Sequence, residues 1–131
     1  MKVISLWQPY ASLMALGHKT VETRSWYTGY RGPLAIHAAK RVFIPDDPEF
    51  QEALKELGIN PFGLPVGAVV GVCELGKCTK IGVQYISYLP RLEELFGDYT
   101  PGRFAWEILN MRKLETPIPW RGQQGFFEVE I

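Results

Sequence analysis

The segment GHKTVETRSW, residues 17–26, gathers within a few positions the side chains best suited to chemistry. It places a carboxylate, Glu22, two residues before a guanidinium, Arg24, and close to the ammonium group of Lys19. The alternation through this segment is that of a β-strand, in which successive side chains point to opposite faces. Thr20, Glu22 and Arg24 are therefore predicted to share one face of a strand.

A carboxylate and a guanidinium on one strand face cost several kcal/mol when they are buried without partners. Paired inside a cleft, they can present donors and an acceptor to a base edge or to a phosphate. Arg24 supplies a planar fork for such a group, whereas Lys19 supplies a more mobile point charge. The alternative is a structural ion pair that braces the first helix against the sheet. Lys19 and Glu22 could also act as general acid and base if their pKa values are shifted.

Aromatic and amide side chains add a second kind of candidate. Single-stranded bases bind by stacking on rings and by hydrogen bonds at their edges. Trp7, Gln8 and Trp26 stand at the ends of predicted elements, where partial exposure of the two rings is expected. Trp106 follows the spacing of a buried strand and is predicted to be core. His37 lies on the predicted neighbouring strand, either as a buried, hydrogen-bonded histidine or as part of the site.

Composition and charge set limits on the class of protein. A chain of 131 residues with 47% hydrophobic and 21% charged residues is predicted to fold as one globular domain, residues 1–131. A net charge of zero argues against a general polyanion binder. Residues 1–44 nevertheless carry six basic residues and one acid, whereas residues 45–100 carry four basic and nine acidic residues. This pattern favours one anion-attracting face, unless folding scatters the charges.

Several functional classes find no support in the sequence. Cys73 and Cys78 are predicted to be free thiols, since two cysteines alone rarely make a disulfide framework or a metal site. No metal-ligand spacing, phosphate-binding loop or nucleophile elbow occurs, so no metal and no cofactor is expected. Apolar runs are too short for a membrane span, no signal peptide is recognised, and a cytoplasmic protein is predicted.

The elements that must position these residues alternate irregularly along the chain. Pro9 before an apolar stripe predicts a helix that ends at Gly17, and Asp46 or Asp47 is predicted to cap a second helix. Five or six short strands with two or three helices predict an α+β fold, a small mixed β-barrel with helices at its rim. Strands are expected near residues 3–6, 19–24, 34–38, 67–75, 103–114 and 125–131, and helices near 9–16, 47–57 and 89–96.

A family resemblance rests on the same segments. The stretch SLWQPYASLMALGHKTVETRSWYTGYRGPLAIHAAK is similar to the ASCH domain, whose pattern includes Q-P-[WY]-A, G-x-K-x-x-E-x-R and Y-R-G. The later GAVVGVCEL and PIPWRGQQGFFEVEI resemble the same family. The resemblance implies a PUA-like pseudo-barrel that binds nucleic acid or a nucleotide-like ligand in a cleft beside the G-x-K-x-x-E-x-R segment.

The resemblance also implies an alternative activity. Some relatives are ribonucleases or amidohydrolases that remove an acyl group from modified cytidine, using a lysine, a threonine three residues later and a distant glutamate. Lys19 matches the lysine, Glu22 occupies the threonine position, and Glu74, Glu93 or Glu94 could supply the glutamate.

Three functions are therefore carried forward. The leading one is binding of RNA or a nucleotide-like ligand, the second is a small hydrolase acting on a modified nucleoside or RNA, and the third is a protein-interaction module with an aromatic patch. The predicted catalytic residues are Lys19 and Glu22. The predicted ligand-binding residues are Trp7, Gln8, Lys19, Thr20, Glu22, Arg24, Trp26 and His37.

Overall fold

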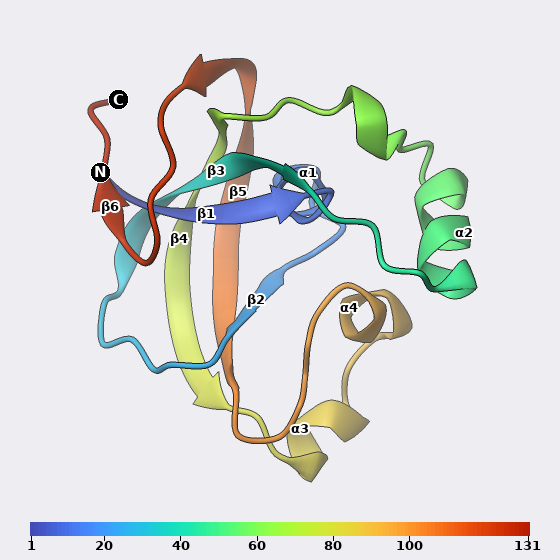
Figure 1. The fold of residues 1–131 in the computed structure, drawn as a ribbon. Coiled ribbons are helices and arrows are strands. Elements are labelled where there is room, and N and C mark those ends of the chain that lie inside the picture. The colour runs from blue at the N-terminus through green and yellow to red at the C-terminus, as the bar shows by residue number, and fades with distance from the viewer.

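The chain folds around one curved six-stranded sheet, seen in a computed structural model that describes residues 1–131 (Figure 1). The strands run in the order β2-β5-β4-β3-β1-β6, and only the β1–β3 pair is parallel. They are β1 (Lys2–Gln8), β2 (Val21–Arg24), β3 (Gly32–Val42), β4 (Ala68–Lys80), β5 (Phe104–Pro119) and β6 (Phe127–Glu128). The helices are α1 (Tyr10–Ala15), α2 (Pro48–Glu56), α3 (Val83–Ser87) and α4 (Arg91–Leu95), with a short 3-10 turn η1 (Pro61–Gly63).

The α+β class is confirmed, but the predicted barrel is not closed. β2 pairs only with β5, and it makes no ladder with β1. β2 has four residues, and β6 pairs only with the first residues of β1. The segment of β1 from Ser5 onward therefore faces β2 across a gap that side chains, not backbone hydrogen bonds, must bridge. This gap becomes the cleft described below.

The first helix forms as predicted and supplies one face of the main core. Gly17 follows it with φ +84°, a conformation that favours glycine, and so lets the chain turn towards β2. The largest buried cluster lies between α1 and the sheet and includes Met14, Ile36 and Trp106. The indole of Trp106 is fully buried, which confirms its predicted core position.

A second small core forms where three helices meet. Asp47 caps α2, because its carboxylate accepts a hydrogen bond from the Glu49 N–H at 3.0 Å, as predicted. Phe50 of α2 packs edge-on against Phe96, with ring centroids 5.4 Å apart, next to Leu13 of α1. The single helix predicted near residues 89–96 is instead the shorter α4, with α3 preceding it.

The strand boundaries differ from prediction where pairing extends beyond the apolar pattern. β4 and β5 continue their ladder well past the buried residues, through register shifts that let two long strands curve together. β3 is also longer than predicted, since its last residues pair with the end of β1. β6 is shorter, because only Phe127 and Glu128 find partners on β1.

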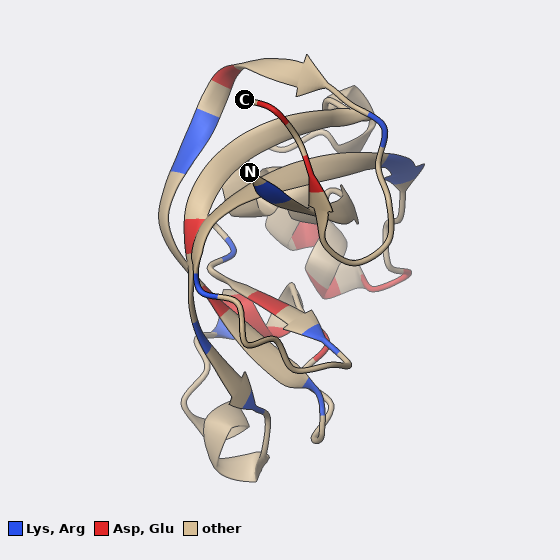
Figure 2. Cartoon of the chain, turned by 90° about the vertical axis from the view of Figure 1, so that its left-hand side faces the viewer, with Lys and Arg blue, Asp and Glu red and all other residues tan.

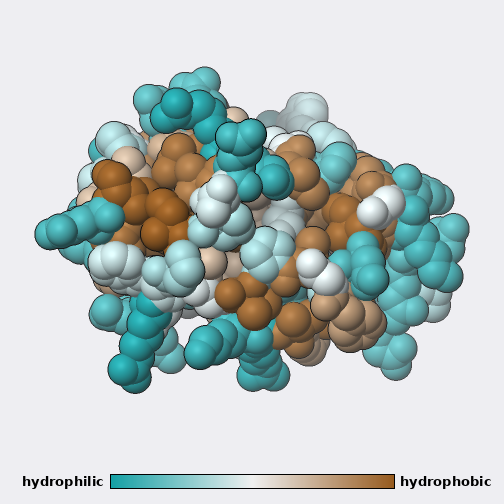
Figure 3. Space-filling model, turned by 90° about the horizontal axis from the view of Figure 1, so that it is seen from above, coloured by the Kyte–Doolittle hydropathy of each residue, from teal (hydrophilic) through white to brown (hydrophobic).

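The charges scatter over the molecule as a whole. Figure 2 shows basic and acidic positions interspersed along strands and loops, with no single basic stripe. On the face in Figure 3, apolar side chains form separate patches with polar groups between them. No helix is long and apolar enough to cross a membrane.

The two thiols should differ sharply in reactivity. Both cysteines are free; Cys73 is buried and Cys78 is partly exposed. Burial raises the pKa of the Cys73 thiol to about 12, with Glu74 adding to the shift. Only the thiolate reacts readily, so one thiol should react with a chromogenic disulfide reagent at about pH 8, and the second only after denaturation. Equal reaction rates for Cys73→Ser and Cys78→Ser in the folded state would contradict this.

Candidate functional site

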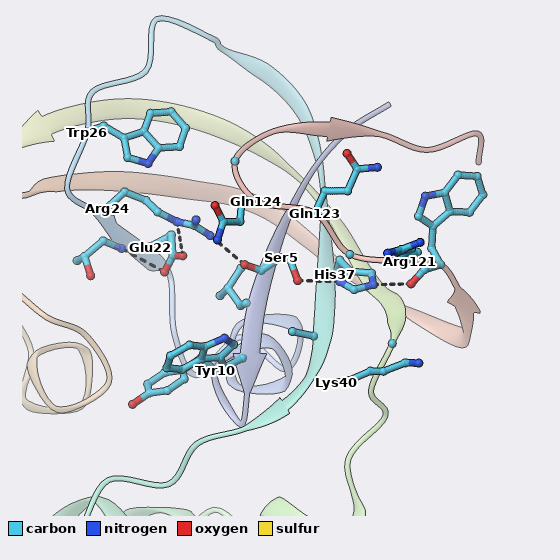
Figure 4. Close-up of a pocket in the computed structure, with 18 of the residues that line it drawn as sticks. Ser5, Tyr10, Glu22, Arg24, Trp26, His37, Lys40, Arg121, Gln123 and Gln124 are labelled. Carbon is cyan, nitrogen blue, oxygen red and sulfur yellow. Dashed lines mark hydrogen bonds and ion pairs between the residues drawn. The ribbon is translucent and has the colours of Figure 1, made fainter.

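An open cleft of about 1360 Å³ lies between β1, β2 and the loop that follows β5 (Figure 4). β1 and β2 contribute the floor, and the loop 120–125 lies along one side. The cleft thus occupies the gap where the sheet fails to close. The lining side chains that can bind or stack are Ser5, Trp7, Tyr10, Glu22, Thr23, Arg24, Trp26, His37, Lys40, Arg103, Trp120, Arg121, Gln123 and Gln124.

Glu22 and Arg24 lie on one face of β2, as the alternation predicts. The Arg24 Nε donates to Glu22 Oε2 at 2.9 Å, and Glu22 Oε1 lies 3.9 Å from the Lys19 Nζ. The Arg24 guanidinium also donates, through Nη2, to the carbonyl oxygen of Ser5 on β1 at 3.1 Å. Arg24 therefore bridges the two strands that the sheet leaves unpaired, and it lines the cleft while doing so.

Lys19 lies behind the cleft wall rather than in it. Its side chain is 1% exposed, and Nζ donates to the Val21 carbonyl. Burial lowers the pKa of the Lys19 ammonium group below its ordinary value, and the carboxylates of Glu22 and Glu93 oppose part of that change. Lys19 does not line the cleft itself, although its amine lies beside Glu22, which does. The predicted catalytic and binding roles of Lys19 gain no support from this position and stay predictions.

Thr20 and Gln8 are also placed outside the cleft lining. The Glu93 carboxylate accepts hydrogen bonds from the Thr20 N–H at 2.9 Å, the Thr20 hydroxyl at 2.9 Å and the Val21 N–H at 3.1 Å. Of the three glutamates considered from sequence, Glu93 is thus the one beside β2. Gln8 is fully buried, and its amide hydrogen-bonds Ser12 and the Pro65 carbonyl. These residues fix the start of β2 and of α1.

His37 lies at the opposite end of the floor from Glu22. Its Nδ1 is 2.8 Å from the Ser5 hydroxyl oxygen, and its Nε2 is 2.7 Å from the Trp120 carbonyl oxygen. Figure 4 shows Ser5 between Arg24 and His37, so that hydrogen bonds run from β2 across β1 to β3 and on to the loop after β5. The His37 ring is buried and hydrogen-bonded, as one alternative predicted, and it also lines the cleft. Its role in ligand binding stays a prediction.

Three tryptophans line the cleft. Trp7, Trp26 and Trp120 are 44%, 36% and 37% exposed, which confirms the partial exposure expected for the first two. Trp26 packs edge-on against Trp106, with centroids 4.8 Å apart, so its ring is held in place. The Arg41 guanidinium lies 4.3 Å from the centre of the Trp7 ring, a distance typical of cation–π stacking.

Some lining residues were not singled out from sequence. Ser5 alternates with the buried Ile4 and Leu6 along β1, and that period was its available signal. Arg121, Gln123 and Gln124 come from PIPWRGQQG, a stretch that entered the sequence analysis only through the family resemblance. Lys40 and Arg103 come from strand ends. No three His, Cys, Asp or Glu side chains lie together where they could hold a metal ion.

The sequence model of the ASCH domain matches residues 4–118, a span that includes β1 through most of β5. The chain belongs to the ASCH domain family. It is 39% identical over 132 residues to activating signal cointegrator 1 of Mus musculus, and 38% identical to the Homo sapiens protein of the same name. Each match covers 97% of this chain but only 22% of the relative, so the chain spans about a fifth of those proteins.

Solved ASCH structures share the fold. The ASCH protein of Zymomonas mobilis matches with a TM-score of 0.61 at 18% identity, covering 98% of this chain and 87% of that one. A mutant of the same protein, with phenylalanine in place of one tyrosine, also gives a TM-score of 0.61, with 89% of that chain covered. At this identity the likeness shows the fold alone.

Proposed function

We propose that this ASCH domain binds single-stranded nucleic acid, RNA in the first instance, in the cleft between β1 and β2. One observation carries the proposal: four cations converge on this cleft in a chain of zero net charge. Arg24, Lys40, Arg103 and Arg121 line it. Glu22 is the one carboxylate that lines it and is paired with Arg24, and Arg103 is paired with Asp98, which lies outside the lining. A local excess of positive charge attracts phosphates even where the whole protein is neutral.

The tryptophans and the size of the cleft favour a strand over a mononucleotide. Three exposed indoles offer flat surfaces for bases, and base stacking does not require a particular sequence. The volume of about 1360 Å³ exceeds the roughly 300–1,000 Å³ of most small-molecule pockets. The hydrolase alternative is not favoured, because Lys19, its expected base, lies outside the cleft lining.

Fluorescence anisotropy with a labelled single-stranded oligoribonucleotide would test this proposal, with DNA of the same sequence, duplex RNA and a mononucleotide in parallel. Four phosphate contacts predict that log K falls with log salt with a slope of about −3. Binding without salt dependence, or equal affinity for the mononucleotide, would contradict the proposal.

Arg121→Gln should make that slope shallower by about 0.7, the contribution of one phosphate contact on a single strand. Arg121 is exposed and lines the cleft, so its loss should leave the fold unchanged. Arg112→Gln is the matched control, since Arg112 is an exposed residue of β5 outside the cleft and carries the same charge. Equal slopes for the two variants would mean that Arg121 does not contact phosphate.

A further inference from the structure

The hydrogen-bond partners of Ser5 and His37 determine which atom of this pair carries each proton. A carbonyl oxygen only accepts hydrogen bonds, so the 2.7 Å contact with the Trp120 carbonyl requires a hydrogen on His37 Nε2. In the neutral ring, Nδ1 is then bare and must accept from the Ser5 hydroxyl at 2.8 Å. In the protonated ring, Nδ1 donates instead, and the Ser5 hydroxyl hydrogen is free to turn towards the cleft.

Gly122 packs closely against this pair. A Cβ at Gly122 would lie 2.8 Å from His37 Cε1, closer than Cβ contacts come in folded proteins, and 3.3 Å from Ser5 Oγ, which is tight. Gly122 is not among the glycines with positive φ, so its backbone conformation does not call for glycine. The missing side chain therefore lets the loop after β5 approach His37 and the Ser5 hydroxyl closely.

The groups that hydrogen-bond or pack against the His37 ring carry no charge. The elements packed against the ring contribute the Ser5 hydroxyl from β1, the Phe127 ring from β6 and the Trp120 carbonyl after β5. The charged groups lining the same cleft are four cations, together with Glu22, which is paired with Arg24. A bound anion beside the ring would favour its protonated form, because an opposite charge stabilises the charged form.

We infer that Ser5 and His37 form a proton-coupled subsite for one phosphate oxygen of the bound strand. The inference rests on the proposed function and names the ligand group that this end of the cleft takes. Phosphate binding favours protonated His37, which accepts the proton from solvent and turns the Ser5 hydroxyl towards the anion as a donor. Because the linkage is reciprocal, a fall in pH must strengthen binding.

Isothermal titration calorimetry in two phosphate-free buffers of different ionisation enthalpy measures the protons taken up on binding. With a single-stranded oligoribonucleotide, the expected result is net proton uptake, at most one proton per strand, within the range of about pH 5 to 8 in which imidazoles change charge. His37→Gln keeps a donor for the Trp120 carbonyl and should abolish the uptake. Ser5→Ala should weaken binding by about ten- to a hundredfold at the acid end, the effect of a lost hydrogen bond to a charged group.

His18→Gln is the matched control, since His18 is the only other histidine and does not line the cleft. Salt-dependent binding without proton uptake, uptake that persists in His37→Gln, or Ser5→Ala that binds like the unaltered protein would each overturn the inference and leave the proposed function intact.

A second measurement decides the inference even if no oligonucleotide binds. The Cε1–H resonance of His37 would be followed by NMR as a function of pH, with and without inorganic phosphate, and His18 would serve as the internal reference. Phosphate should move the titration of His37 to higher pH and leave that of His18 unchanged. Equal shifts of both resonances, or none, would overturn the subsite.

Discussion

Replacing Trp106 with alanine should lower the free energy of unfolding by about 3–5 kcal/mol, the usual cost of truncating a large buried aromatic side chain. The indole is fully buried in the main core, and it packs against Trp26 and Phe126, with centroids 4.8 and 5.5 Å away. Urea unfolding followed by circular dichroism would measure the change.

Two further variants test whether the loss of stability in Trp106→Ala comes from lost core packing. Trp106→Phe should cost much less stability than Trp106→Ala, since it keeps an aromatic ring and removes an indole N–H that has no hydrogen-bond partner.

Trp26→Ala should cost about 1 kcal/mol of stability, roughly the value of its aromatic contacts. The same change should weaken RNA binding about ten- to a hundredfold, as expected when one stacked base loses its platform. Early melting with normal binding would place the stacking surface elsewhere.

Local patterns predicted the floor of the cleft well. The period of two placed Glu22 and Arg24 on one face, and apolar spacing placed Trp106 in the core. These successes share a cause: each depends on the alternation within a single strand, which is visible over a few residues.

The features of the fold and the cleft that the sequence did not predict depend on contacts between segments far apart in the chain. His37 and Trp120 are 83 positions apart, and Thr20 and Glu93 are 73 apart, so neither pairing leaves a local signal. The lack of a local signal for contacts between distant segments also explains why the prediction of a closed barrel was wrong. Strand number suggested closure, but closure depends on whether β2 pairs with β1. β2 has only four residues and reaches β1 through the Arg24 side chain, so a gap is left instead. The sequence also cannot show that Lys19 is buried and does not line the cleft.

Arg24 could brace the sheet, contact the ligand or do both, and paired variants can separate these roles. Arg24→Met should lower the free energy of unfolding by about 3 kcal/mol, the lower end for a broken buried ion pair. The lower end applies because the Arg24 side chain keeps 21% exposure, whereas that of Glu22 keeps 10%. The variant leaves the Glu22 carboxylate without its 2.9 Å partner and removes the bridge to the Ser5 carbonyl.

Adding Glu22→Gln to Arg24→Met should recover about half of that loss, because a neutral amide no longer requires a charged partner. RNA affinity should not recover with it, since the phosphate fork is absent from both variants. Urea unfolding and anisotropy on the same four proteins, the parent, both single variants and the double variant, would give the two couplings separately. A double variant that regains stability and also binds like the parent would assign Arg24 to bracing β2 against β1 alone, and the phosphate contacts would then belong to the remaining cations of the cleft.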